Sequence, residues 1–114
     1  MLTNDQVEHY REKGYLGVEG VFSTAEVAEL ARVTGEFVDQ SREFTEHTDA
    51  FDLEPDHTPE APRLRRLKSP VRRHAVYDRA LRNDKVLDMV STLVGTPGIR
   101  YNGDKLNIKG AESG

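Results

Sequence analysis

Two complete helix-start signals within the first forty residues constrain the fold more than any other feature of this chain. In each signal a hydroxyl side chain at the N-cap stands three positions before a glutamine or glutamate, so that each side chain can satisfy the other residue's backbone N–H group. The two pairs are Thr3 with Gln6 and Ser23 with Glu26. They predict one helix from position 4 to about Lys13, where Gly14 can end it, and a second helix from position 24 to about Ser41.

Helix and strand patterns alternate along the rest of the chain. In order, the predicted elements are a short strand over 15–18, an extended run over 63–68, a helix over 71–82, a capped helix from Asn83 to Gly95 and a long strand over 99–109. Side chains in a strand alternate between its two faces. Arg66 and Lys68 would therefore share one face, and Tyr101, Lys105 and Asn107 would share another. The mixture of elements predicts an α+β fold.

Charge is distributed unevenly along the chain. Residues 43–60 contain seven acidic residues and no lysine or arginine, whereas residues 63–85 contain nine basic residues and two aspartates. The segment 43–62 also contains three prolines, and we predict that it is an acidic, proline-containing loop. The two blocks can be solvated faces that attract each other, or the basic block can be a binding surface for phosphate, carboxylate or nucleic acid.

Composition excludes several classes of protein. The chain has 114 residues and no cysteine, which excludes a disulfide scaffold, a thiolate zinc site and a cysteine nucleophile. No stretch approaches the roughly 20 apolar residues of a membrane span, and the first residues lack the pattern of a signal peptide. We therefore expect a cytoplasmic protein without a membrane partner. The net charge of −4 argues against a nucleic-acid partner.

One sequence triplet has the spacing of an iron site. His47-Thr48-Asp49 is a His-x-Asp motif, the spacing that supplies two ligands of a facial triad when a second histidine completes it. Here the triplet lies in the acidic, turn-rich segment, with no strand pattern around it. We interpret it as part of a solvated loop, and we predict no metal ligand in this chain.

Three polar residues on predicted strands have a different character. Lys68 lies on the extended run, and Lys105 and Asn107 lie two positions apart on the last strand. A lysine and an asparagine on one strand face can offer a cation and an amide donor to a carboxylate, which accepts charge-assisted hydrogen bonds. The alternative is that all three are simply exposed strand residues.

The order of these segments resembles the N-terminal part of the phytanoyl-CoA dioxygenase family of Fe(II)/2-oxoglutarate oxygenases. The stretches that carry the resemblance are 2–7, 10–16, 18–23, 52–55, 65–70 and 94–109. The resemblance covers essentially the whole chain. It implies that residues 1–114 are a single region that forms the N-terminal helices and first strands of a double-stranded β-helix, a jelly-roll, cupin-like fold.

The resemblance also implies roles for particular residues. Lys68 matches a lysine that reaches toward the carboxylate of 2-oxoglutarate, and Lys105 and Asn107 match positions that line the pocket of this cosubstrate. Arg66, on the face of Lys68, is a candidate for an anionic group of the substrate. In the complete enzyme, Fe(II) and 2-oxoglutarate would activate O2 to hydroxylate a small organic substrate.

The chain departs from the family at the iron site. The family's His-x-Asp motif follows shortly after the strand that matches residues 105–109, and residues 110–113 match the start of the loop toward it. None of the iron ligands is present, so we predict no catalytic residue and no complete cofactor site in this chain alone. Its expected partner is the C-terminal half of the barrel.

Two other functions remain open at this point. One is a catalytically inactive module, or a truncated relative, that binds a partner or dimerises. The other is an anion or nucleic-acid binder that uses the basic segment 63–85. Binding of the second kind would weaken steeply with salt, because each neutralised phosphate releases counterions.

Overall fold

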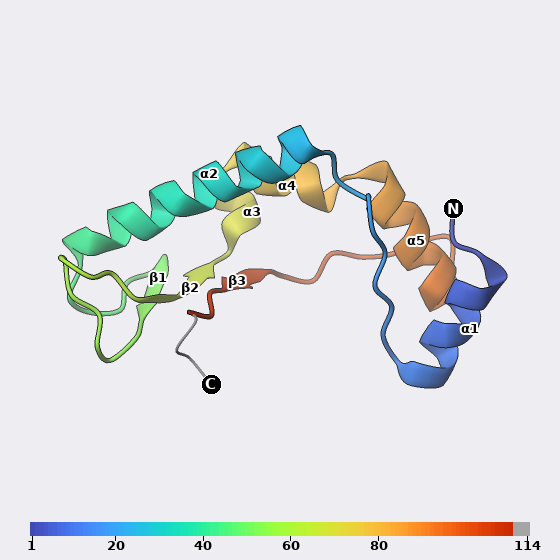
Figure 1. Cartoon of the computed structure of the whole chain (residues 1–114), viewed down its shortest axis with the longest axis horizontal. Coiled ribbons are helices and arrows are strands. Elements are labelled where there is room, and N and C mark those ends of the chain that lie inside the picture. Colours follow the sequence, from blue (N-terminus) through green and yellow to red (C-terminus); the bar gives the residue numbers. More distant parts are fainter. Residues whose placement is uncertain (111–114) are drawn as a thin grey trace.

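The computed structural model describes residues 1–110, and these residues form helices packed on a small sheet (Figure 1). In chain order the elements are α1 (Asn4–Lys13), α2 (Thr24–Gln40), the 3-10 turn η1 (Ser41–Glu43), β1 (Phe51–Leu53), β2 (Leu64–Lys68), α3 (Pro70–Arg73), α4 (Ala75–Leu81), α5 (Asp84–Val94) and β3 (Lys105–Asn107). The predicted α+β class is confirmed.

Both predicted capping boxes are formed. At the start of α1 the Thr3 hydroxyl accepts a hydrogen bond from the backbone N–H of Gln6 at 3.1 Å, and the Gln6 side chain accepts one from the backbone N–H of Thr3 at 2.8 Å. Ser23 and Glu26 repeat these bonds, with the same two distances, at the start of α2. The first helix ends at Gly14, whose φ of 82° is the left-handed conformation that glycine adopts without strain. Local sequence therefore sets these helix ends.

The predictions for segments 15–18 and 43–62 need correction. Residues 15–18 form no strand, and none of the described strands pairs with them, so they run as an extended connection between α1 and α2. The segment 43–62, expected to be a loop throughout, contains the strand β1. Its short apolar alternation, Phe51-Asp52-Leu53, is paired with β2, which satisfies its backbone.

The predicted helix over 71–82 is in fact two helices separated at His74. The backbone of His74 is extended, with φ −152° and ψ 139°, and its ring Nδ1 accepts a hydrogen bond from the backbone N–H of Val76 at 3.0 Å. The histidine therefore acts as the N-cap of α4, a position where serine, threonine, aspartate and asparagine are the usual residues.

The predicted long strand over 99–109 is reduced to β3, and Tyr101 lies outside it. The Asp104 carboxylate accepts a hydrogen bond from the backbone N–H of Val71 at 2.7 Å and another from the Tyr101 hydroxyl. Together with a backbone hydrogen bond of 3.2 Å from the Ser69 N–H to the Asp104 carbonyl, these bonds hold the segment before β3 against the start of α3.

The three strands form an antiparallel sheet in the order β1-β2-β3. Leu53 is opposite Leu64 and Asp52 is opposite Arg66, so Arg65 is an extra residue of β2 that has no partner on β1. Such a bulge shifts the alternation of side chains by one position. As a result Leu64 and Leu67, three residues apart, are both buried.

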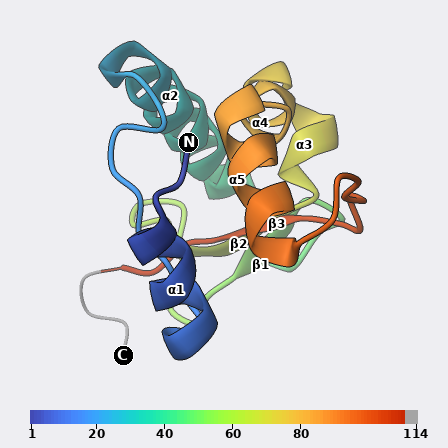
Figure 2. The same cartoon turned by 90° about the vertical axis from the view of Figure 1, so that its right-hand side faces the viewer.

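The core lies between this sheet and the helices. Its buried apolar residues are Val33, Phe51, Leu53, Leu64, Leu67, Val76 and Tyr77. They come from α2, α4 and one face of the sheet, and Figures 1 and 2 show α2, α3 and α4 together on that side of the strands. The Tyr77 hydroxyl also shares a hydrogen bond of 2.7 Å with Thr34, which ties α4 to α2. The opposite face of the sheet is left for polar side chains.

The molecule is elongated, with extents of 49 × 30 × 27 Å and a radius of gyration of 16.8 Å. A compact domain of this length has a radius of gyration of about 13 Å. The excess comes from α1 and α5, which contact each other at one end of the molecule and contain no buried residue (Figure 1). Within residues 1–110, no helix has the length and apolar character needed to cross a membrane.

Candidate anion-binding face of the sheet

The sheet brings all four predicted site residues together on one face. In the antiparallel pairing of β2 with β3, Arg66 is opposite Asn107 and Lys68 is opposite Lys105. Residues directly opposite each other in such a pair project from the same face. Leu67 and Leu106, between them on the two strands, pack toward the core on the other face. Lys68, Lys105, Asn107 and Arg66 therefore form one polar cluster on the face away from the helices.

Asp52 of β1 is a fifth member of this cluster that the sequence analysis did not select. One carboxylate oxygen lies 3.2 Å from the Lys68 ammonium, and the other accepts a hydrogen bond from Arg66 Nη1 at 3.3 Å. Its side chain is 20% exposed. We call these five residues (Asp52, Arg66, Lys68, Lys105 and Asn107) the polar face. Three cations and one carboxylate give it a formal charge of +2.

The surroundings of Asp52 favour its charged form. Burial alone would raise the pKa of this carboxyl, but the hydrogen bond and charge of Lys68, with the charges of Arg66 and His47, lower the pKa below its ordinary value. At neutral pH the polar face therefore contains a carboxylate that is fully ionised.

Acid is expected to destabilise the fold partly by protonating Asp52. The folded-state pKa is lower than that of an unfolded aspartate, about 3.9. The ion pairs therefore contribute stability that is present above that pH and is lost as the pH falls through the folded-state pKa. Thermal unfolding from about pH 6 to about pH 2 should show a smaller loss of Tm in Asp52→Asn than in the original chain. Parallel pH profiles would contradict this assignment.

Arg66 connects the two outer strands across the polar face. Its Nη1 donates to Asp52 and its Nε donates to the side-chain oxygen of Asn107 at 3.2 Å. The Asn107 amide is therefore oriented with its oxygen toward Arg66, and its NH2 group has no acceptor among residues 1–110. Lys105 is exposed and forms no ion pair with any described residue. Two groups that can donate to an anion are therefore still available on this face.

The two charge blocks of the sequence pair with each other, as the first interpretation expected. Six of the nine bases in 63–85 lie within 4.0 Å of an acid in the segment 43–60. The pairs are Arg63 with Asp56, Arg65 with Glu54, Arg66 and Lys68 with Asp52, and Arg72 and Arg73 with Asp49. Most of the basic charge is thus balanced within the chain. No observation here favours nucleic-acid binding.

The His-x-Asp triplet at 47–49 stabilises the turn that leads into β1. His47 Nδ1 accepts a hydrogen bond from the backbone N–H of Leu53 at 3.0 Å, and the Thr48 hydroxyl accepts from the N–H of Phe51 at 2.9 Å. The Asp49 carboxylate lies 3.3 Å from Arg73. These bonds explain the triplet without a metal. Across residues 1–110, no group of three or more His, Cys, Asp or Glu side chains is placed to hold a metal ion.

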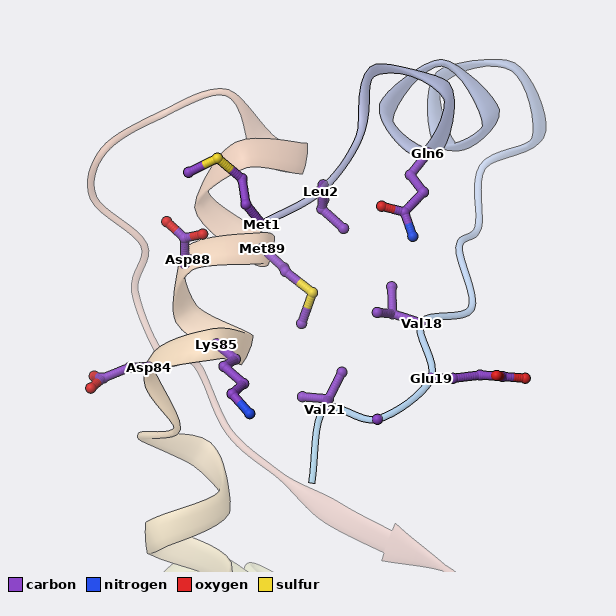
Figure 3. Close-up of a pocket in the computed structure, with 11 residues that line it drawn as sticks. Met1, Leu2, Gln6, Val18, Glu19, Val21, Asp84, Lys85, Asp88 and Met89 are labelled. Carbon is purple, nitrogen blue, oxygen red and sulfur yellow. The ribbon is translucent and has the colours of Figure 1, made fainter. Parts of the chain in front are cut away.

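A pocket of about 480 Å³ lies apart from the sheet, between the N-terminal residues, the connection 18–21 and α5 (Figure 3). Apolar side chains of Leu2, Val18, Val21 and Met89 project into it, with Lys85 at its edge. None of its lining residues belongs to a strand. The predicted site residues therefore do not line this pocket.

These features define an α+β domain whose sheet has helices on one face and a cationic polar cluster on the other. Comparison with known proteins identifies its family. A model of the phytanoyl-CoA dioxygenase (PhyH) family matches residues 10–112, and the chain belongs to this family. No curated protein and no solved structure matches the chain.

Proposed function

We propose that this chain is the N-terminal part of a non-haem Fe(II)/2-oxoglutarate-dependent dioxygenase, and that its polar face binds the cosubstrate. The observation that carries the proposal is the grouping of Lys68, Lys105 and Asn107 on one sheet face by the strand register. Membership of the phytanoyl-CoA dioxygenase family supports the oxygenase class. The helices on the opposite face are consistent with a sheet whose polar side lines the interior of a double-stranded β-helix.

The residues of the polar face fit a carboxylate ligand. Lys68 has three ammonium donors and uses one for Asp52, which leaves two that can reach a ligand oxygen. Lys105 adds a second cation, and the Asn107 NH2 group adds a neutral donor beside it. Arg66, already bonded on both sides, is our weaker candidate for an anionic substrate group. With iron and O2, bound 2-oxoglutarate would supply the oxidising power for hydroxylation of a small organic substrate.

The described residues do not fit iron. Residues 1–110 contain no group of three or more His, Cys, Asp or Glu side chains placed to hold a metal ion. In the family the iron-binding His-x-Asp follows the strand that matches 105–109. The start of the loop toward it was predicted at residues 110–113, of which 111–113 lie outside the described residues. We propose that the iron ligands come from polypeptide that completes the barrel with this chain.

The test of the cosubstrate site is a titration of the chain with 2-oxoglutarate, followed by NMR. We expect saturable shifts of the backbone signals of Lys68, Lys105 and Asn107, because these residues would contact the ligand. The signals of α1 should stay unchanged and serve as the internal control. Absence of saturable shifts on β2 and β3 would contradict binding at this face. A His-x-Asp codon pattern shortly after codon 114 would separately support the oxygenase assignment.

A further inference from the structure

The carboxylate of Asp52 contacts two cations of the polar face at once. Its two oxygens are divided between Lys68, at 3.2 Å, and Arg66, at 3.3 Å. It is the one acid that the three strands place on this face of the described sheet. Both bonds are charge-assisted, and bonds of this kind fix the position of a side chain more strongly than neutral ones.

Without this carboxylate the polar face would contain only like charges. Lys68 is directly opposite Lys105, and like charges at directly opposed positions destabilise a sheet. Arg66 is two residues from Lys68 on the same face. Three cations in this arrangement would repel one another and turn toward solvent, so their head groups would lose the defined positions seen in the structure.

The influence of Asp52 extends across the sheet to Asn107. Asp52 holds the Arg66 guanidinium through Nη1, and the same guanidinium donates through Nε to the Asn107 oxygen at 3.2 Å. An asparagine amide can be turned either way, and its hydrogen-bond partners decide which end is the donor. Arg66 holds the oxygen, so the NH2 end is the one left for a ligand.

We propose that Asp52 is a positioning residue, which orients Lys68 directly, and Asn107 through Arg66, so that both can donate to a ligand carboxylate. This inference rests on the proposed function of the polar face. Asp52 itself does not touch the ligand. Its negative charge opposes an anion, and its contribution comes from geometry.

The direction in which Asp52→Asn changes the affinity for 2-oxoglutarate distinguishes a positioning role of Asp52 from a purely electrostatic one. Asp52→Asn keeps the size of the side chain but removes the negative charge, which by electrostatics alone should tighten the binding of an anion. If Asp52 positions its neighbours, the same change should weaken the binding of 2-oxoglutarate by roughly tenfold, because charge-assisted hydrogen bonds to the ligand lose their alignment. Glu54→Gln is the matched control, since it removes one carboxylate from a neighbouring ion pair. The Glu54 side chain bonds to Arg65 and not to Arg66 or Lys68.

The experiment measures 2-oxoglutarate affinity by NMR titration for the original chain, Asp52→Asn and Glu54→Gln, with thermal unfolding as the check of folding. We expect weaker binding in Asp52→Asn and a change of less than about twofold in Glu54→Gln. Binding that is unchanged or tighter in Asp52→Asn would overturn the inference. If Asp52→Asn does not fold, Asp52→Glu replaces it. Glutamate keeps the charge but moves the carboxylate by one methylene, so a positioning role predicts weaker binding by about threefold or more, and unchanged affinity would overturn the inference.

A second measurement tests the positioning role of Asp52 even if the polar face does not bind 2-oxoglutarate. The side-chain NH2 signals of Asn107 are recorded without any ligand. In Asp52→Asn these signals should shift, because Arg66 is no longer held against the Asn107 oxygen. Unchanged signals would overturn the positioning role. Failure of the original chain to bind 2-oxoglutarate would instead overturn only the proposed cosubstrate site.

Discussion

Leu67→Ala is expected to lower the free energy of unfolding by about 3 kcal/mol, within the range of 2–5 kcal/mol for a buried leucine. Leu67 is fully buried at 0% exposure, in the central strand, with Phe51 opposite on β1 and Leu106 opposite on β3. Its loss removes packing from both strand pairs and leaves a cavity at the centre of the sheet. Urea unfolding followed by circular dichroism measures the change.

Leu106→Ala provides the graded control for this prediction. Leu106 is the partner of Leu67 on β3, but it is only partly buried at the edge of the core. We expect it to cost less than half as much as Leu67→Ala, because less apolar surface returns to water. If the two variants are equally stable, the core is not centred on Leu67. The m-value should stay constant if both variants unfold from the same compact state.

Lys68→Ala is expected to weaken the binding of 2-oxoglutarate by roughly tenfold to a hundredfold, the range that corresponds to one hydrogen bond with a charged group. Lys68 is the cation that stands between Asp52 on β1 and Lys105 on β3. Its removal takes away a direct donor and also leaves Asp52 with Arg66 as its remaining cation on the face. Isothermal calorimetry or an NMR titration of the chain measures the loss.

Lys85→Ala is the matched control for Lys68→Ala. Lys85→Ala removes the same charge as Lys68→Ala. Lys85, however, lies on α5 and lines the pocket of Figure 3, and it does not belong to the sheet. An effect limited to Lys68 would support local contact with the ligand. Equal losses in the two variants would show that net charge alone governs the affinity. Circular dichroism spectra should confirm that both variants keep the same helix content.

Features that depend on neighbours in sequence could be predicted, and those that depend on distant partners could not. The capping boxes and the ends of α1 and α5 follow from bonds within one helical turn. The break at His74 was missed because histidine is not a common N-cap. The shortened β3 was missed because Asp104 bonds to Val71, which is distant in the sequence.

The polar face likewise has features that the sequence could predict and features that it could not. Alternation placed Lys105 and Asn107 on one face from sequence alone, and it did the same for Arg66 and Lys68. The two pairs lie on the same face of the sheet because of the register between β2 and β3. The pattern of a single strand does not specify this register. Asp52 was missed because three prolines suggested a continuous loop, although the apolar–polar–apolar order of Phe51-Asp52-Leu53 is typical of a strand.

The helices α1 and α5, at one end of the elongated molecule, are expected to have a lower local stability than the sheet. Because α1 and α5 contact each other without burying any residue, separating them exposes little apolar surface that was not already hydrated. Their backbone amides should exchange with solvent through local opening, long before those of β2. The walls of the pocket at this end are therefore expected to separate more readily than β2, the central strand that carries Arg66 and Lys68 of the polar face.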